Sequence, residues 1–552
     1  MERGIAYFSM EIGLRPEIPT YSGGLGILAG DTIKSAADLK IPLHAVTLLS
    51  EQGYFHQTFD AQHNQQETPV YWPKHDYLEL LPERVYVHIE GRIVHIQAWR
   101  YIVKGLQGHQ VPVYYLDTNL PENSAYDRTL TSRLYGGDYW YRMCQEIVLG
   151  IGGVRLLRTL QMPIKKYHMN EGHAAFLTLE LLREQKRVAD TDDATLVEQV
   201  KNMCVFTTHT PVPAGHDAFE EAWVKRALGN QFDIDMAQAV RDGKFNMTIL
   251  AMNFASHING VAKKHGEVSS SMFPGYTIYA ITNGVHAPTW VSEPFTHLFN
   301  KYIEGWKEDN FMLRYALNIP NNEVWQAHQQ AKQQLIEYVN TTYNTSLDVN
   351  VLTIGFARRF ASYKRADLIF QDMQQLLDMH KHVGKIQVIM AGKAHPHDTG
   401  GKEKLRYIRE LMDTYKDRIT LVFLDNYEMW LAHKMISGCD IWLNTPIRPR
   451  EASGTSGMKA TLNGVLHFSI LDGWWIEGWV EQVTGWSIGP NADAHTEDDA
   501  QDLYDKLRTK IIPLYYNDKQ QWITMMKHAI SHNGSFFNTQ RMVSQYMLNS
   551  WL

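Results

Sequence analysis

The stretch Asp440-Ile-Trp-Leu-Asn444, with Glu451-Ala-Ser-Gly-Thr-Ser-Gly-Met-Lys459-Ala-Thr-Leu462 shortly after it, decides the fold class of the second half of the chain. The first part is a short apolar run typical of a buried strand, and residues 458–462 are compatible with a helix. Residues 454–457 lie between them, and their backbone N–H groups would point at an anion at the helix start. Glycine, serine and threonine before a helix also form ordinary caps, so both interpretations stay open at this point.

Strand-like and helical patterns alternate along the rest of the chain. A strand at residues 4–10 is followed by a glycine turn, a helix that ends near Leu39 and a strand at 42–49. A second alternating series begins with a strand at 349–355. Alternation of this kind favours parallel sheets flanked by helices, whereas the interrupted β-rich residues 85–116 predict an antiparallel addition. Helices are also predicted at 138–157, at 323–338 before a polar link at 340–345, and after a capping box at 496–499.

These patterns predict an α/β protein with two Rossmann-like domains that face a central cleft. The expected ranges are 1–285 for the first domain, 286–530 for the second, and 531–552 for a terminal helix that packs back toward the first. A chain of 552 residues that is 44% hydrophobic and 20% charged is too long for one core, which agrees with two large domains.

Charge, hydropathy and cysteine usage limit the partners and the location. The net charge of −7 gives no general basic footprint for nucleic acid. No run approaches the roughly 20 apolar residues of a membrane span, and the first residues lack the apolar core of a signal peptide. Three cysteines are too few for a disulfide framework and fit a reducing compartment. We therefore expect a cytoplasmic protein with neither nucleic acid nor membrane as a partner.

Two further blocks place cations or glycines directly after a predicted strand. Gly355-Phe-Ala-Arg-Arg-Phe-Ala-Ser-Tyr-Lys-Arg365 has four cations within eight residues. Such a cluster is often a solvated face, but ligands of open α/β sheets bind at the carboxyl ends of strands, which favours a site. Tyr21-Ser-Gly-Gly-Leu-Gly26 opens the first helix, where glycines let the backbone approach an anion closely. A tight structural turn explains the same glycines equally well.

Polar blocks follow three other strand-like segments, and their sequences are Tyr167-His-Met-Asn-Glu-Gly-His173, Thr207-Thr-His-Thr-Pro-Val-Pro-Ala-Gly-His-Asp217 and Ile281-Thr-Asn-Gly-Val-His286. Loops at a cleft edge carry such groups, although a single histidine there more often makes a structural hydrogen bond. A fourth block, Gly392-Lys-Ala-His-Pro-His-Asp398, offers two histidines and an aspartate in close spacing. Without further ligands this spacing is weak support for a metal, and we expect none.

Together these blocks resemble the α-glucan (glycogen, starch and maltodextrin) phosphorylases, in their short prokaryotic form, from Tyr7 to at least Gly478. In that family the lysine matched by Lys459 carries pyridoxal phosphate, and the glutamate matched by Glu451 lies in the glucose site. Many retaining sugar-nucleotide transferases have a second glutamate where this chain has Lys459. The resemblance implies a GT-B type glycosyltransferase fold.

The resemblance also implies roles for individual residues. The catalytic set would be Lys459, Arg359, Lys364, His209 and Glu451. The cofactor would be held by Lys459, Gly454, Thr455, Ser456 and Arg358, where the family more commonly has lysine at the last position. The substrates would be bound by Gly23, Gly24, Leu25, Glu171, His173, His209, Asn283, Tyr363, Glu451, Ala452, Ser453 and Gly454. Glu171 and His173 would bind the acceptor side of the glucan. Longer members of the family have Asp-Thr where Glu171-Gly172 stands, so this chain differs from them at that position.

The reaction implied is reversible phosphorolysis of a terminal α-1,4-glucosidic bond with retention, which yields α-D-glucose 1-phosphate. The partners would be an α-1,4-glucan and orthophosphate, and the cofactor phosphate would assist proton transfer. Family members commonly form homodimers, and we do not expect control by nucleotides or N-terminal phosphorylation. Two alternatives remain: a nucleotide-sugar-dependent glucan synthase of the same fold, without pyridoxal phosphate, and a noncatalytic glucan-binding protein.

Overall fold

The computed structural model describes residues 4–188, 192–232, 236–489 and 498–552. They form two compact units, and neither unit is a continuous piece of chain, whereas the predicted domain ranges were continuous. Unit 1 contains Met1–Phe55, Pro69–Thr282 and Met542–Leu552, and unit 2 contains His56–Thr68 and Asn283–Arg541. No helix in the described part of the chain combines the length and the apolar character that crossing a membrane requires.

Unit 1 is built on a mixed sheet with the strand order β14-β13-β9-β8-β1-β2-β7-β6-β5. The strands are β1 (Gly4–Ser9), β2 (Leu43–Leu48), β5 (Glu79–Ile89), β6 (Arg92–Lys104), β7 (Gln110–Asp117), β8 (Ile164–Asn170), β9 (Cys204–Thr207), β13 (His257–Gly260) and β14 (Tyr279–Ala280). Neighbours are parallel except in the β5-β6-β7 meander, which confirms the predicted antiparallel addition. Every residue of β1 is buried, as expected for a strand covered on both faces. The order of chain connection reverses between β1 and β8.

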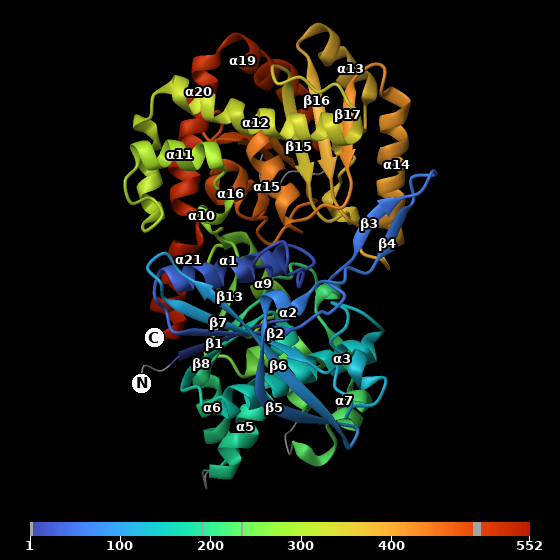
Figure 1. The fold of residues 1–552 in the computed structure, drawn as a ribbon, viewed down its shortest axis with the longest axis vertical. Coiled ribbons are helices and arrows are strands. Elements are labelled where there is room, and N and C mark those ends of the chain that lie inside the picture. Colours follow the sequence, from blue (N-terminus) through green and yellow to red (C-terminus); the bar gives the residue numbers. More distant parts are fainter. Residues whose placement is uncertain (1–3, 189–191, 233–235, 490–497) are drawn as a thin grey trace. The chain divides into compact units, whose positions relative to one another are not determined.

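Unit 2 contains a parallel sheet with the order β17-β16-β15-β18-β19-β20. Figure 1 labels its strands β15, β16 and β17. The strands of this sheet are β15 (Leu352–Ala357), β16 (Ile386–Ala391), β17 (Thr420–Leu424), β18 (Ile441–Asn444), β19 (Leu466–Ile470) and β20 (Gly485–Ile488). Numbered along the chain this order is 3-2-1-4-5-6, the order of a Rossmann sheet. The strand predicted at residues 440–444 is β18, and the short helix predicted after it is α16 (Ser456–Thr461).

A hairpin from the first part of the chain completes unit 2. Its strands, β3 (His56–Phe59) and β4 (Gln65–Thr68), lie beside α14 (Thr399–Tyr415) in Figure 1. Gln57 donates to the carbonyl of Gly392 at 2.9 Å, and Gln65 donates to the carbonyl of Ala394 at 2.9 Å. Glutamine pairing across more than 300 residues has no local sequence signal, and the hairpin was not predicted.

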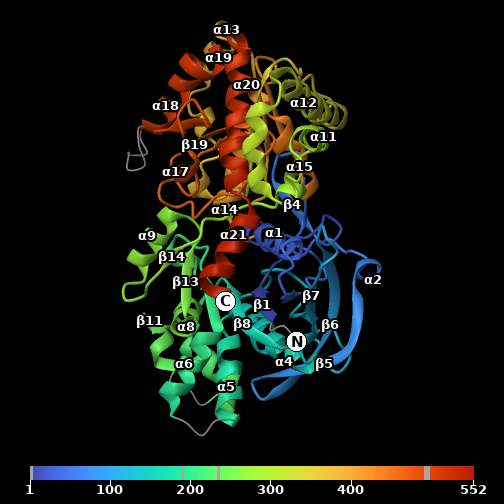
Figure 2. The same ribbon diagram turned by 90° about the vertical axis from the view of Figure 1, so that its left-hand side faces the viewer.

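The last residues of the chain return to unit 1. Helix α21 (Thr539–Tyr546) and the π-helical η13 (Met547–Trp551) end beside β8, as Figure 2 shows. The indole N–H of Trp551 donates to Nδ1 of His168 at 3.1 Å, and the Tyr546 hydroxyl lies 3.1 Å from Oγ1 of Thr207. Both aromatic side chains are buried, so the tail is part of a core of unit 1.

One predicted helix extends beyond its expected end, and the predicted start of another lies partly outside the described residues. The helix predicted at 323–338 is α12 (Asn321–Tyr343), so most of the predicted polar link is helical and the left-handed residue Asn344 ends it. Asn340 makes this extension possible because its side chain bonds outward, accepting from the N–H of Leu347 at 2.8 Å. Residues 496 and 497 of the predicted capping box lie outside the described residues, and α18 (Asp499–Lys506) follows them.

Candidate active site

Two loops of unit 2 leave neighbouring strands where the strand order reverses. One loop follows β15 and begins at Arg358, and the other follows β18 and leads through Glu451 to α16. This reversal is where open α/β sheets bind ligands. The basic block and the lysine segment, which lie about ninety residues apart in the sequence, therefore meet at one edge of the sheet.

The carboxylate of Glu451 joins the two segments. Its Oε2 accepts hydrogen bonds from Arg358 Nη2 at 2.7 Å and from Lys364 Nζ at 2.6 Å. Arg358 also contacts Asn444 at the end of β18 through Nη1. Glu451 and Lys364 are each 7% exposed, so the ion pairs are largely shielded from water. The sequence predicted each of these residues, but not that the two cations converge on the glutamate.

The same carboxylate has a strongly shifted pKa. Burial alone would raise it, but the charges of Arg358 and Lys364 outweigh burial and lower the pKa of Glu451 to about 2. Asp472 lies behind Glu451 and accepts from its backbone N–H at 2.9 Å. Burial, together with the negative charge of Glu451, raises the pKa of Asp472 to about 7. Sequence reasoning missed Asp472, whose only signal is its position just after β19.

Lys459 lies on α16 and is 7% exposed. Its Nζ is 3.9 Å from the centre of the Trp290 ring, close enough for a cation–π interaction. The turn before it is shaped by glycines: Gly454 has a φ of +81°, and a Cβ on Gly457 would lie 2.6 Å from the His467 ring. Thr455 precedes the helix, and Ser456 Oγ accepts from the indole of Trp442 at 3.0 Å.

Two polar atoms of these loops are buried without a hydrogen-bond partner among the described residues, namely Ser453 Oγ and Arg358 Nε. Such groups are rare in folded proteins, and each commonly faces a ligand or ordered water. A donor hydroxyl, a guanidinium N–H and a buried lysine are the groups that a phosphate-bearing aldehyde would require. The residues present therefore fit a pyridoxal phosphate site.

The remaining residues of the two loops differ in exposure. Arg359 is exposed and is not one of the cations on Glu451. Tyr363 is half-buried, and its ring centre lies 4.5 Å from Lys364 Nζ. Burial raises the pKa of Tyr363, but the neighbouring cations, Lys364 foremost, outweigh it, and the pKa is lowered. Ala452 is half-buried within the loop of Glu451.

In unit 1, the loops after β8 and β9 bring Glu171 and His209 together. The buried Glu171 carboxylate accepts from the N–H of His209 and from Thr210 Oγ1, both at 2.8 Å. The backbone of Glu171 has a φ of +75°. This conformation is strained for a residue other than glycine, and such strain is often found at functional sites. His209 Nε2 lies 2.5 Å from Asn170 Oδ1, and burial lowers the pKa of His209 to about 4. This histidine is therefore neutral near pH 7.

His173, the other acceptor-side residue, lies against acidic side chains. Its Nε2 is 3.4 Å from Asp217 Oδ2. Glu146, which sequence reasoning missed, is fully buried, and within the described structure its carboxyl oxygens have no hydrogen-bond partner. Burial and the neighbouring Asp217 raise the pKa of Glu146 well above its usual range, while the pKa of Asp217 is lowered despite burial. Of these two carboxyl groups, Glu146 is therefore the weaker acid.

The glycine loop after β1 is partly engaged within unit 1. Helix α1 (Gly24–Asp38) starts directly after Gly23, but the N–H of Gly23 donates to Glu11 Oε2 at 3.2 Å. Glu11 also accepts from the N–H of Ser22 at 2.6 Å and from the Tyr135 hydroxyl at 2.9 Å. A Cβ on Gly23 or Gly24 would meet no atom within 4 Å. The space in front of this turn is open, and the first-turn N–H groups of α1, including Leu25, have no intrahelical acceptor.

Asn283 lies at the first residue of the longer segment of unit 2. Its backbone carbonyl accepts from Arg541 Nη2 at 2.9 Å. Its Oδ1 is buried and, in the described part of the structure, accepts no hydrogen bond. The next residue, Gly284, has no room for a side chain, because a Cβ there would lie 2.2 Å from the backbone of Asn538. The amide oxygen of Asn283 is therefore held in place by its neighbours and available to a ligand hydroxyl.

Comparison with the sequences of known proteins shows the family of the chain. The sequence profile of the family described as carbohydrate phosphorylase matches residues 230–488. The maltodextrin phosphorylase of Thermococcus litoralis is 40% identical over 99% of this chain and 70% of its own length, and the glycogen phosphorylase of Mycobacterium tuberculosis is 38% identical with the same coverage. The protein MJ1631 of Methanocaldococcus jannaschii, named uncharacterized, is 32% identical over 98% of both chains. The chain therefore belongs to the carbohydrate phosphorylase family and is an enzyme of the glycosyltransferase class.

Proposed function

We propose that the protein is an α-1,4-glucan phosphorylase that converts the terminal glucosyl unit of glycogen, starch or maltodextrin and orthophosphate into α-D-glucose 1-phosphate, with retention. The observation that carries this proposal is the buried carboxylate of Glu451, held by Arg358 and Lys364 on the loop that leads to the buried Lys459. A glucan synthase that uses nucleotide sugars binds no pyridoxal phosphate and therefore does not require a buried lysine at this position. The relatives named maltodextrin and glycogen phosphorylase support the same reaction.

In this proposal Glu451 binds sugar rather than donating a proton. A carboxyl group with a pKa of about 2 is ionised at all physiological pH values and can only accept hydrogen bonds from glucose hydroxyls. The backbone of Ala452, Ser453 and Gly454 adds further polar groups beside it. We propose Asn283 as a further sugar-binding residue of unit 2. In unit 1 we propose His209, neutral near pH 7, as a sugar-binding residue, and Glu171 and His173 as residues that bind the acceptor side.

In this proposal the proton for the leaving oxygen comes from orthophosphate. As the bond between the anomeric carbon and the glycosidic oxygen breaks, a phosphate O–H protonates that oxygen, which leaves as the 4-hydroxyl of the shortened glucan. A phosphate oxygen then bonds to the anomeric carbon from the same face, which retains its configuration. Lys364 and Arg359 would neutralise the phosphate, and Tyr363 would line this position. For unit 1 we propose that the first-turn N–H groups at Gly24 and Leu25 bind an anionic part of the substrates.

We assign the cofactor site to Lys459, Gly454, Thr455, Ser456 and Arg358. Pyridoxal phosphate bound there would supply a second phosphate group that assists proton transfer to and from the substrate phosphate. Two adjacent phosphates repel each other, so a site that holds both needs several cations. The concentration of Arg358, Arg359 and Lys364 within seven residues meets this requirement.

Three finer assignments belong to the same proposal. The two doubly wound sheets support a GT-B type fold. The three cysteines are all free and buried, which suits a reducing cytoplasm. A homodimer is the assembly that we propose on the basis of the family alone.

The test is the release of glucose 1-phosphate from maltoheptaose by purified protein, with and without orthophosphate and with added pyridoxal phosphate. We expect release that depends on orthophosphate and increases with cofactor. Glucosyl transfer from ADP-glucose or UDP-glucose to maltoheptaose, without any phosphate-dependent release, would instead establish the glucan synthase.

A further inference from the structure

The carboxyl group of Asp472, just after β19, supports the loop of Glu451 from within unit 2 and takes no part in the reaction as described above. Its Oδ2 accepts from the backbone N–H of Glu451 at 2.9 Å, and its Oδ1 accepts from the N–H of Gly473 at 2.8 Å. Asp472 is 2% exposed, so water does not compete for these bonds. A buried carboxyl that accepts from two backbone N–H groups has one preferred orientation. Asp472 therefore fixes the position of the Glu451 backbone.

The turn that begins at Asp472 makes a second connection to the same loop. The N–H of Trp474 donates to the carbonyl of Ser453 at 2.9 Å. Gly473 has a φ of +56°, and a Cβ there would lie 2.3 Å from the same carbonyl oxygen. Glycine is needed at this point because a side chain has no room and the backbone is left-handed. Two hydrogen bonds therefore join this turn to the loop that begins at Glu451.

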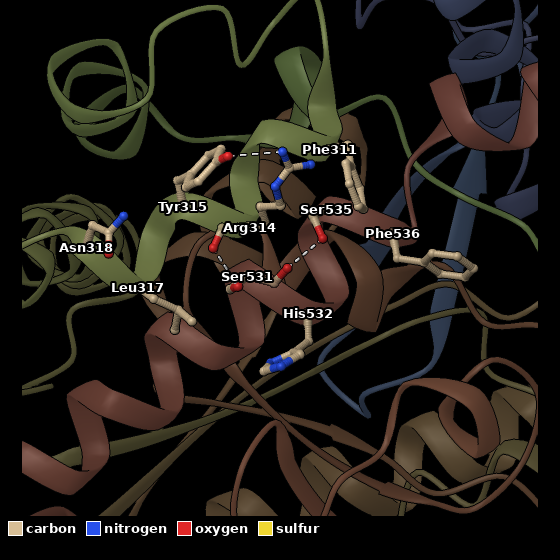
Figure 3. A pocket seen from close by; sticks show the side chains of 9 residues that line it. All are labelled: Phe311, Arg314, Tyr315, Leu317, Asn318, Ser531, His532, Ser535 and Phe536. Atoms are coloured by element: carbon tan, nitrogen blue, oxygen red, sulfur yellow. Dashed lines mark hydrogen bonds between the residues drawn. The ribbon is translucent and has the colours of Figure 1, made fainter.

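The turn is itself anchored in the core of unit 2. Trp474 is 1% exposed, and its ring centre lies 4.8 Å from that of Phe537. Phe537 follows the π-helix η12 (Ala529–Gly534), which is joined to the 3₁₀-helix η7 (Asn310–Asn318). Figure 3 shows this junction, where Ser531 Oγ donates to a backbone carbonyl of η7 at 2.8 Å. A turn packed in this way is a rigid support for the loop.

The carboxyl of Asp472 can hold the loop in either protonation state. Burial, together with the charge of Glu451, raises the pKa of Asp472 to about 7. The ionised form has two acceptor oxygens, and the neutral form keeps a carbonyl oxygen. The N–H of Glu451 needs only one acceptor. Asparagine, which also has a carbonyl oxygen, can therefore take over this bond, whereas alanine cannot.

We propose that Asp472 is a positioning residue of the sugar site, which fixes the backbone of Glu451 so that its carboxylate points at hydroxyl groups of the glucosyl unit. Arg358 and Lys364 hold the carboxylate end of this residue, and Asp472 holds its backbone end. A group fixed at both ends loses little conformational entropy when a sugar binds. The identity of the sugar rests on the proposed function, and the support of the loop rests on the hydrogen bonds alone.

The test compares Asp472→Ala with Asp472→Asn in the full chain with bound pyridoxal phosphate. Alanine leaves two buried N–H groups without acceptors, so kcat/KM for maltoheptaose should fall by about 10- to 100-fold, while the KM for orthophosphate should change by less than about threefold. Asparagine should keep kcat/KM within about fivefold of the unchanged protein. Asp472→Ser retains one hydroxyl acceptor, should give an intermediate value, and replaces the alanine variant if that variant does not fold.

Asp425→Ala is the matched control. Asp425 also follows a strand of this sheet directly, and burial raises its pKa as well. Its ion pair is with Arg409 and not with the loop of Glu451. The control variant should therefore keep both kcat/KM for maltoheptaose and the KM for orthophosphate.

A double-mutant comparison separates a positioning role from a general structural one. In the Glu451→Gln background, Asp472→Ala should cost less than about threefold in kcat/KM, because no carboxylate remains to be positioned. Costs that multiply in the double variant overturn the proposal. So does a loss of cofactor absorbance, or an equal rise in the KM for orthophosphate, in Asp472→Ala, because Asp472 would then support the loop as a whole.

Binding of α-D-glucose 1-phosphate in the absence of glucan, measured by isothermal titration, separates this inference from the proposed function. Weaker binding in Asp472→Ala than in Asp472→Asn supports the positioning role, even if no form of the protein carries out phosphorolysis, a result that overturns the proposed function alone. Equal binding by the alanine variant and the unchanged protein overturns the positioning role alone. No binding by the unchanged protein overturns both.

Discussion

At the scale of single residues, Glu451 and Lys459 have complementary tasks on one loop. Glu451 is ionised and fixed by two cations, which suits it to accept hydrogen bonds from a sugar. Lys459 lies against the Trp290 ring, so its ammonium group is partly removed from water. Once it has lost its proton, an amine held in that position can bond a carbonyl group of the cofactor.

Lys459→Ala should abolish both phosphorolysis and cofactor retention. The purified variant is expected to lack the near-ultraviolet absorbance and the phosphorus content that one pyridoxal phosphate per chain would give. Lys416→Ala, at an exposed lysine after α14, is the control and should keep both. Full phosphorolysis by the Lys459 variant would disprove the cofactor assignment.

Arg359→Ala should raise the KM for orthophosphate far more than the KM for maltoheptaose. Removal of one charge-assisted hydrogen bond costs about 1.5–3 kcal/mol, which corresponds to roughly 10- to 150-fold in affinity. Because Arg359 is exposed and is not among the cations on Glu451, its loss should leave the glucan site intact. Initial rates over a grid of both substrates measure the two constants, and equal increases in both would show that the residue acts on the loop rather than on phosphate.

At the scale of elements, the β3-β4 hairpin is attached to unit 2 by a small set of buried amide bonds. Gln57 has no exposed surface; its Nε2 donates to Gln65 and to the Gly392 carbonyl, and its Oε1 accepts from the N–H of Asn426 at 2.9 Å. Phe59 adds an aromatic contact, because its ring centre lies 5.6 Å from that of Phe423, so the buried amide bonds and this contact together hold the hairpin.

Gln57→Ala should therefore destabilise unit 2 by roughly 2–4 kcal/mol, because it leaves buried donors and acceptors without partners. Gln66→Ala, on the same hairpin, removes only an exposed hydrogen bond to Asp60 and should change stability by less than about 0.5 kcal/mol. Urea unfolding followed by tryptophan fluorescence measures both. Similar midpoints for the two variants would mean that the hairpin contributes nothing to the stability of the unit.

Elements with a local pattern could be predicted from the sequence, and elements fixed by distant partners could not. The buried run of β18 with its glycine turn, and the broken β-rich segment of the β5-β6-β7 meander, carry their own signals. The hairpin carries none, because Gln57 and Gln65 bond to residues more than 300 positions away. For the same reason the sequence predicted Glu451, Arg358 and Lys364 as site residues but not the ion pairs between them. It also missed Glu146, because the burial of this residue depends on the packing of α3 (Tyr139–Ile147).

At the scale of the whole molecule, stability should depend on buried histidines. Burial lowers the pKa of His168 to about 3, of His265 to about 4 and of His467 to about 3. In the unfolded chain these side chains take up protons near pH 6.5, whereas the folded chain keeps them neutral. Stability is therefore fully present above pH 6.5 and is lost as the pH falls from there toward 3–4.

Between pH 6.5 and pH 5, each of these histidines should cost about 2 kcal/mol of folding free energy. Guanidinium unfolding midpoints, measured from pH 8 to pH 5, should fall below pH 6.5, although less than the histidines alone would give, because Asp472, whose pKa is raised to about 7, takes up a proton in the folded chain. His265→Gln should show a smaller fall, since glutamine can still accept from the N–H of Val261 but does not titrate. Midpoints that stay constant down to pH 5 would contradict the argument.

The interleaved course of the chain has a consequence for synthesis on the ribosome. Unit 1 needs Met542–Leu552, whose Tyr546 and Trp551 fill its core, and unit 2 needs a hairpin made near the start. At about 5–20 residues per second, the first unit waits roughly 15 to 55 seconds after Thr282 for its last buried side chains. Neither unit can be expressed as a simple N- or C-terminal fragment, and a nascent chain released early would expose the apolar surface that the tail covers.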